Sequence, residues 1–346
     1  MKIQEKVIIS NFVLIGEDHF MNEVPPIVSA ISKTAHFDNL FIELDAYSTE
    51  VIANRLKTRS SVELNKFVKE YSHTFSFYNL QPEFNLLKEV IEAKTNVYGT
   101  EQVFLFSDKL IFDDLLRSTS NEKAREIYRQ MSLNSVSSFE KLKEDINEPF
   151  YMLSDEYGKQ LATLLALQLS EKEMDVLKDI SLSRKIYIDQ SHALRIQLMK
   201  QQMLENITAL QTQKNLFKYG ANHMTSGESL LRIYDLGNLV SNIADSRFEK
   251  SVHIMIVGKN GEQGVGLPGQ PSSKLDPDSG DLSFLKPFFD TTNSEEYHTY
   301  DLVPIRKEVI AGKIQIDNKS LLRTIMGYDF LVIIPDVTAA KVLDLK

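Results

Sequence analysis

The sequence predicts an α/β fold with a mostly parallel central sheet, flanked by helices and carrying a large helical insertion. Over residues 1–102, and again over 212–346, short apolar runs alternate with amphipathic segments, a pattern typical of parallel sheets with helices on their faces. Residues 103–211 instead repeat apolar residues at helical spacing and contain one glycine, Gly158, and one proline, Pro149. We therefore expect an α/β core formed by 1–102 and 212–346, and a helical cap formed by 103–211.

Each expected element has a local reason. Apolar or β-branched runs that end at glycine or acidic residues predict strands at 12–16, 39–44, 96–99, 215–220, 253–258 and 329–335. Helices are expected near 22–34, from a Ser48 cap, and from Pro82, which is favoured in a first helical turn. The loop at 258–300 is rich in Gly, Pro, Ser and Asp, and its segment GKNGEQGVGLPG is interpreted as a flexible lid.

Two of these strands end in similar motifs. In VLIGEDHF, Glu17 and His19 follow a glycine, Gly16, and in LFKYGANHM, Asn222 and His223 follow another, Gly220. We expect glycine there because it accepts backbone angles that end a strand. Ligands of open α/β sheets bind just beyond the carboxyl ends of the strands, so the two histidines are expected to lie in one site.

Acidic residues end two further strands. Glu43 lies within the apolar run NLFIELDAY, where a buried carboxylate needs a partner. His19 and His223 are the candidates for that partner. Glu101 follows the strand at 96–99 and is a candidate for the second rank of the same site, with a solvated strand end as the alternative.

A helix before the second motif carries polar residues on an apolar face. Steps of three or four residues predict one continuous stripe that consists of Ile188, His192, Arg195, Met199, Met203, Asn206 and Leu210. Its polar members need partners or a wet cavity. His192 and Arg195 are therefore candidates to line the site, and pairing with carboxylates at a seam between helices is the alternative.

Composition excludes several classes of function. The 346 residues carry a net charge of −9 and form no large basic cluster, which argues against nucleic acid as a partner. The absence of cysteine excludes disulfides, thiolate metal sites and a cysteine nucleophile. No apolar stretch approaches the roughly 20 residues of a membrane span. Without a signal peptide in this chain a cytoplasmic location is expected, although a processed precursor is also compatible. The oligomeric state is not encoded in any pattern we recognise.

The motifs together resemble a known group. Two GxxH segments and a strand that ends in glutamate are similar to the superfamily of erythromycin esterases, ChaN-like haem-binding proteins and TraB/Tiki proteins. GEDH matches the GExH of ChaN-like proteins, and Met203–Asn206 matches the Met–x–x–Asn element of the esterases. The resemblance implies a site that consists of Glu17, His19, Glu43 and His223. The esterases usually carry a second histidine at the late motif, where this chain has Met224.

The leading hypothesis is a hydrolase that activates water for a small-molecule or peptide substrate. In one mechanism Glu17, His19, Glu43 and His223 hold a divalent metal, for which Zn²⁺, Mn²⁺ and Co²⁺ are suitable. In the other, a carboxylate polarises His19, which deprotonates water without a metal. The alternatives are a non-catalytic protein that binds haem, a metal or another small ligand, and an effector or toxin domain that reuses the fold. The sequence contains no G-x-S-x-G nucleophile elbow.

Overall fold

The computed structural model describes residues 3–58, 60–265, 271–293 and 296–343. By their contacts the residues form two compact units. The first contains Met1–Glu43, Leu80–Tyr98 and Met203–Val342, and the second contains Leu44–Asn79, Gly99–Gln202 and Leu343–Lys346. The division at 103 and 211 that the sequence suggested stays a prediction. Within the described residues, no helix combines the length and the apolar character needed to cross a bilayer.

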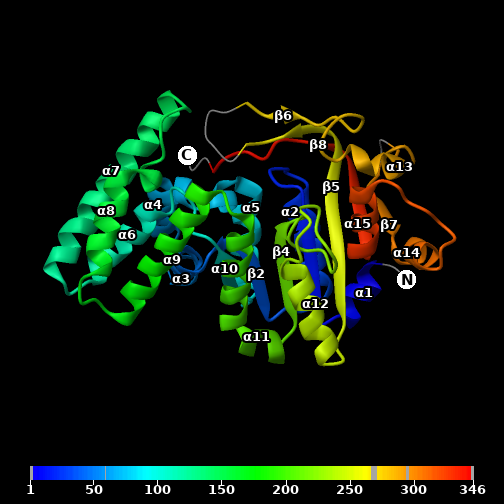
Figure 1. The fold of residues 1–346 in the computed structure, drawn as a ribbon, viewed down its shortest axis with the longest axis horizontal. Coiled ribbons are helices and arrows are strands. Elements are labelled where there is room, and N and C mark those ends of the chain that lie inside the picture. Colours follow the sequence, from blue (N-terminus) through cyan, green and yellow to red (C-terminus); the bar gives the residue numbers. More distant parts are fainter. Residues whose placement is uncertain (1–2, 59, 266–270, 294–295, 344–346) are drawn as a thin grey trace. The chain divides into compact units, whose positions relative to one another are not determined.

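An eight-stranded, mostly parallel sheet runs through the first unit, as predicted (Figure 1). Its order is β3-β2-β4-β1-β5-β8-β7, and β6 pairs with β5. β7 and β6 are antiparallel to their neighbours, whereas β1, β2, β4, β5 and β8 pair in parallel. The strands are β1 Phe12–Glu17, β2 Asn39–Asp45, β3 Asn96–Glu101, β4 Asn215–Gly220, β5 Ser251–Gln263, β6 Ser273–Lys274, β7 His298–Asp301 and β8 Phe330–Val337.

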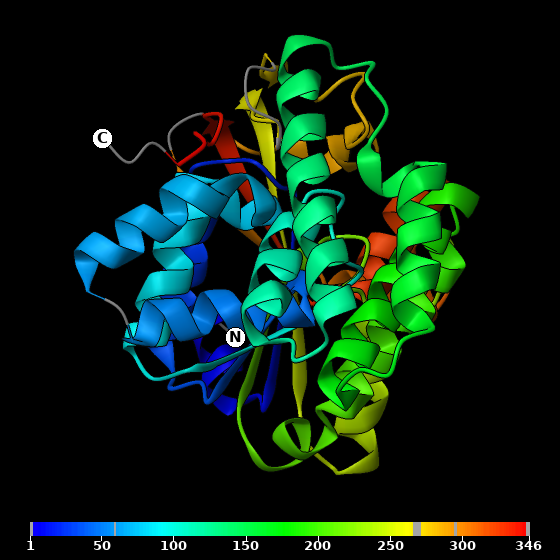
Figure 2. The same cartoon turned by 90° about the vertical axis from the view of Figure 1, so that its left-hand side faces the viewer.

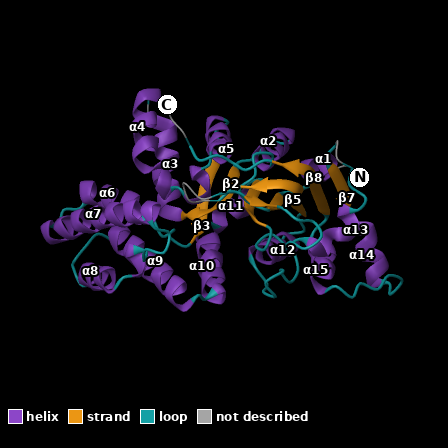
Figure 3. Ribbon diagram, turned by 90° about the horizontal axis from the view of Figure 1, so that it is seen from above, coloured by secondary structure: helices purple, strands orange, loops and turns teal. Residues whose placement is uncertain are grey.

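Helices of the first unit cover both faces of this sheet. Figure 3 shows α2 and α5 on one face and α12 and α15 on the other. The helices are α1 Ile3–Ile9, α2 Val24–Thr34, α5 Gln81–Glu92, α11 Ile207–Thr212, α12 Leu236–Ser246, η4 Ser283–Leu285, α13 Lys286–Phe289, α14 Val303–Ile310 and α15 Lys319–Gly327. Because both faces are covered, β1, β2 and β4 are buried along their whole length. The rings of Phe41 and Phe217 stack in this core with centroids 5.0 Å apart.

The second unit is predominantly helical (Figure 2), and the helices predicted over 103–211 are found there for most of that range. Polar residues begin several of its helices: Ser60 and Ser170 form capping boxes with Glu63 and Glu173, and Asn121 caps α7. The helices are α3 Ala46–Thr58, α4 Ser61–Tyr71, η1 Ser72–Thr74, η2 Ser76–Asn79, α6 Asp108–Ser118, α7 Glu122–Glu144, η3 Tyr151–Leu153, α8 Asp155–Leu165, α9 Glu171–Asp189 and α10 His192–Glu205.

Three local expectations were wrong. α3 follows β2 directly, and Asp45, not Ser48, supplies the oxygen that accepts the backbone N–H of residue 48, at 2.8 Å. The loop expected at 258–300 contains the end of β5, β6, α13 and the start of β7. The proposed lid segment therefore begins as a strand, and its residues 266–269 lie outside the described residues.

The polar stripe expected on one continuous helix is divided among three. Gln190 adopts a left-handed backbone (φ 49°) that ends α9, and α10 ends before Asn206. Met199, Met203 and Leu210 are buried, as a core-facing stripe requires. Ile188 is exposed, because the break at Gln190 separates it from the face that they form.

Candidate functional site

The topology places three of the predicted site segments on adjacent strands. β4 lies between β2 and β1, and Glu17 of β1 is in register with Gly220 of β4. All three strands are parallel, so their carboxyl ends meet at one edge of the sheet. The predicted convergence of Glu17, His19, Glu43 and His223 at that edge is confirmed.

His19 stands just beyond β1, between two carboxylates. Its Nδ1 lies 2.9 Å from Oε1 of Glu17, and its Nε2 lies 3.4 Å from Oε2 of Glu43. The loop that carries it is fixed by Gln263, whose amide donates to the carbonyl of His19 at 2.9 Å and to Asp18 at 2.8 Å. The end of β5 thus positions the first histidine.

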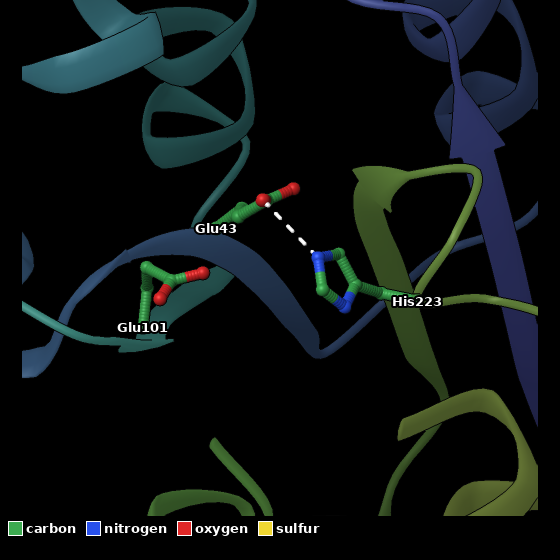
Figure 4. A group of neighbouring side chains, drawn as sticks. All are labelled: Glu43, Glu101 and His223. Atoms are coloured by element: carbon green, nitrogen blue, oxygen red, sulfur yellow. Dashed lines mark ion pairs between the residues drawn. The ribbon is translucent and has the colours of Figure 1, made fainter. Parts of the chain in front are cut away.

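His223 stands beyond β4 in a matching arrangement. Its Nε2 lies 3.5 Å from Oε1 of Glu43, and Figure 4 shows this ion pair. Its Nδ1 lies 3.0 Å from Oδ2 of Asp235, a residue that sequence reasoning missed. Asp235 is the N-cap of α12, and its position just before the apolar run LGNLV was the signal that could have identified it.

Glu43 is the centre of the arrangement. Each of its oxygens faces the Nε2 of one histidine, and Oε2 also accepts the backbone N–H of Gly220 at 2.7 Å. Its side chain is 6% exposed, so these contacts replace water. The result is a linear chain of groups, Glu17–His19–Glu43–His223–Asp235, which we call the histidine–carboxylate chain.

Electrostatics within this chain favour charged rings. Burial lowers the pKa of both imidazoles, but hydrogen bonds and charges of the flanking carboxylates outweigh it and raise the pKa of His19 to about 10 and that of His223 to about 9. Burial raises the pKa of Glu43, and the charge of His223 together with the hydrogen bond to His19 brings it well below its usual range. The three buried carboxylates thus require compensating positive charge at the ring nitrogens.

The motif glycines are required for space, which corrects the reason expected from the sequence. Both lie in extended strands, where no left-handed backbone is needed. A Cβ at Gly16 would stand 2.3 Å from the hydroxyl of Tyr328, and one at Gly220 would stand 2.8 Å from Nε2 of His19. Tyr328 in turn donates a hydrogen bond to the carbonyl of Ala221. A methyl group at either glycine would displace a part of the site.

A buried ion triad lies behind the first motif, and the sequence reasoning missed it as well. Nζ of Lys218 donates to Oε1 of Glu17 at 2.7 Å and to Oε1 of Glu83, in α5, at 2.9 Å. Burial raises the pKa of Glu17, and the ammonium of Lys218 with the hydrogen bond to His19 brings it below its usual value. A lysine inside the apolar run NLFKYG was the available signal.

Four further residues were expected to line the site: Glu101, Arg195, His192 and Asn222. Within the second unit Glu101 and Arg195 form a two-bond ion pair, in which Nε of Arg195 lies 2.9 Å from Oε1 of Glu101 and Nη2 contacts the other oxygen. His192 begins α10 and is exposed, and Asn222 is half-buried in the loop before His223. The functional roles that the sequence suggested for these four residues stay predictions.

The donor types of the histidine–carboxylate chain, imidazole nitrogen and carboxylate oxygen, are those that bind divalent cations. Each Nε2 faces one oxygen of Glu43, and carboxylates hold the two Nδ1 atoms, as the outer nitrogens of metal-binding histidines usually are held. One divalent cation would also supply the positive charge that otherwise comes from two ring protons.

Comparison with known proteins identifies the fold. No family model and no curated protein sequence matches the chain. Among solved structures, a mutant of erythromycin esterase EreC in its open conformation is 12% identical, with a TM-score of 0.60 over 99% of this chain and 95% of that chain. A protein from Bacillus cereus is 13% identical, with a TM-score of 0.56 over 98% and 92% of the two chains. A succinoglycan biosynthesis protein is 14% identical, with a TM-score of 0.57 over 99% and 91%. At these identities the likeness establishes the fold, and it confirms the predicted resemblance at that level.

Proposed function

Because the chain has the fold of erythromycin esterase, we propose that it is a hydrolase that activates water at His19, Glu43 and His223. One observation carries the proposal: two imidazoles turn their Nε2 atoms to one buried carboxylate, while a separate carboxylate holds each Nδ1. Such a pattern fixes both the orientation and the proton of each ring, as general acid–base catalysis requires. The substrate class is a small molecule or a peptide.

His19 is the member of the chain that receives the proton of water. Its side chain is 19% exposed, whereas those of Glu43 and His223 are 6% and 5% exposed. Solvent and substrate therefore reach His19 first. Glu17 accepts a hydrogen bond from the N–H at Nδ1 of His19. Nε2 is therefore the basic nitrogen once the proton on Nε2 is displaced. When Nε2 takes up the proton of water, Glu17 stabilises the imidazolium. His223 and Asp235 hold Glu43 in place from the opposite side.

A divalent metal is the second part of the proposal. His19, His223 and Glu43 would hold it, and Glu17 and Asp235 would orient the rings. When bound, such a cation supplies Lewis-acid activation of water and replaces the ring protons. Without it, a substrate that brings positive charge, or a rise in pH, must free Nε2 of His19.

The test combines metal analysis with an activity screen. The protein is purified without affinity-tag nickel, its metal content is measured, and it is assayed on p-nitrophenyl esters and fluorogenic peptides with and without EDTA. His19→Ala should lose the hydrolysis that the parent shows. His36→Ala is the matched control, because the side chain of His36 is 76% exposed and pairs with Asp38 at the surface. Loss that EDTA reproduces indicates the metal mechanism, and loss that EDTA does not reproduce indicates His19 as the general base. Full activity of His19→Ala, or no hydrolysis of any probe, would refute the proposal.

A further inference from the structure

Lys218 is an unusual residue for its position. It lies in β4, a strand otherwise buried and mainly apolar, and its side chain is 3% exposed. A buried ion pair is weak support for stability, because well-packed apolar residues of similar volume usually serve as well. A lysine at this position therefore suggests a task other than packing.

The register of the sheet brings this lysine to the first histidine motif. Lys218 is paired with Ile15 of β1 and with Ile42 of β2. Residues two apart on a strand share a face, so Glu17 lies on the same face as Ile15 and one step closer to the carboxyl edge. From there Nζ of Lys218 reaches Oε1 of Glu17 at 2.7 Å.

One oxygen of Glu17 makes two contacts. Oε1 receives both the ammonium of Lys218 and Nδ1 of His19, at 2.7 and 2.9 Å. Oε2 is buried and has no hydrogen-bond partner within the described part of the chain. The orientation of this carboxylate toward His19 therefore depends on the lysine.

The second motif needs no such lysine. Oδ1 of Asp235 accepts the backbone N–H of Leu236 at 2.7 Å, and Oδ2 faces Nδ1 of His223 at 3.0 Å. The start of α12 thus fixes this carboxylate through the main chain, with a separate oxygen for each contact.

From this difference we propose that Lys218 is a positioning residue, which holds Glu17 in the orientation that accepts a hydrogen bond from Nδ1 of His19. Glu83 serves as the second counter-ion that keeps the ammonium inside the sheet. The consequence for catalysis rests on the function proposed above, in which Nε2 of His19 takes a proton from water. The orientation itself can be tested without any substrate.

The experiment is ¹⁵N NMR of the full chain labelled at the histidine rings, with His19 and His223 assigned from His19→Gln and His223→Gln. Lys218→Met alone leaves Glu83 buried without its cation, so the test variant is Lys218→Met with Glu83→Gln. We expect the Nδ1 signal of His19 to shift in the double variant, because Glu17 no longer holds the hydrogen bond to Nδ1, while the His223 signals keep their parental positions. His223 is thus an internal control for the fold.

Two control variants isolate the lysine. Glu83→Gln alone leaves the contact between Lys218 and Glu17 intact and should keep the parental His19 signals. Lys214→Met removes a lysine just before β4, whose ammonium donates to the carbonyls of Val7 and Ile8, and should also leave His19 unchanged. Unchanged His19 signals in the double variant, equal changes at His19 and His223, or the same His19 change in Glu83→Gln would overturn the proposal.

An activity arm separates this inference from the proposed function. If the parent cleaves a p-nitrophenyl ester, the double variant should lower kcat by about 10–100-fold and leave KM unchanged. A loss of activity of this size is usual when the group that orients an active-site histidine is removed. A parent without hydrolase activity refutes the proposed function, and the NMR result still decides the role of Lys218. A normal kcat beside a changed His19 ring refutes the catalytic consequence of that role.

Discussion

The two GxxH segments of this chain look alike in sequence but are held in place differently. In the first, the partner carboxylate Glu17 lies two residues before His19 and is itself held by the side chain of Lys218. In the second, the partner Asp235 follows His223 by one loop and is fixed by the backbone of α12. The first histidine is the more exposed of the two. The comparison teaches that similar motifs can present one accessible imidazole and one buried imidazole, each held by a carboxylate of different origin.

The largest difference between the motifs is expected in the relation between activity and stability. His19→Ala should reduce hydrolysis by about 10²–10⁴-fold, the usual contribution of a general acid or base. Its melting temperature should fall less than that of His223→Ala, because the ring of His19 is more exposed and Lys218 still contacts Glu17. The measurement is the hydrolysis rate together with a melting curve. An inactive variant that is also unfolded would make His19 structural and would remove the distinction.

His223→Ala should also lose activity, and in addition it should lose stability. The ring lies between Glu43 and Asp235, and its removal leaves two buried carboxylates without their shared partner. We expect the free energy of unfolding to fall by about 1–3 kcal/mol. Urea denaturation of both histidine variants checks this directly. Equal stabilities for His19→Ala and His223→Ala would show that burial does not separate the two motifs.

A further prediction tests whether the motif glycines are needed because a larger side chain would clash with their neighbours. Gly16→Ala should destabilise the protein by about 1–3 kcal/mol through overpacking, because the added Cβ would stand 2.3 Å from the hydroxyl of Tyr328. Tyr328→Phe in the same chain should restore part of that loss. Gly227→Ala is the control, since an added Cβ there has nothing within 4 Å. If both alanine variants melt together with the parent, the glycines are not needed for space.

The last prediction concerns a buried carboxylate in the second unit whose pKa is raised. Asp108 accepts from Ser135 at 2.6 Å in the second unit, and burial raises its pKa to about 7 despite that hydrogen bond. The folded state therefore binds the proton more tightly than the unfolded state, and this stability is present below about pH 4 and lost as the pH rises to 7. Asp108→Asn should be more stable than the parent by about 1–3 kcal/mol at pH 8.

Urea denaturation at several pH values checks the effect. The advantage of Asp108→Asn should shrink as the pH falls toward 4, and an advantage independent of pH would contradict the explanation. The contrast with Glu17 is instructive, because there the ammonium of Lys218 keeps a carboxylate of similar burial below its usual pKa.

Much of the fold could be predicted from local pattern. The strands predicted at 12–16, 39–44 and 215–220 are confirmed to within one residue, because strands covered on both faces need no polar alternation and appear as apolar runs. Helix caps were harder: Ser48 was expected to begin a helix, because the sequence does not show that α3 follows the strand directly. The single stripe from Ile188 to Leu210 failed for a similar reason, since periodicity does not register a left-handed turn at Gln190.

The site, like the fold, combines features that the local sequence showed with features that only the tertiary structure showed. The sequence by itself determined which residues end the strands, and hence Glu17, His19, Glu43 and His223, because chemistry-bearing residues after apolar runs are a local signal. Only the tertiary structure decided that Asp235 contacts His223 and that Lys218 contacts Glu17, and that the glycines make room for Tyr328 and His19. The physical reason is strand order: β2, β4 and β1 become neighbours through crossovers, and contacts made across a sheet leave no periodic trace along the chain.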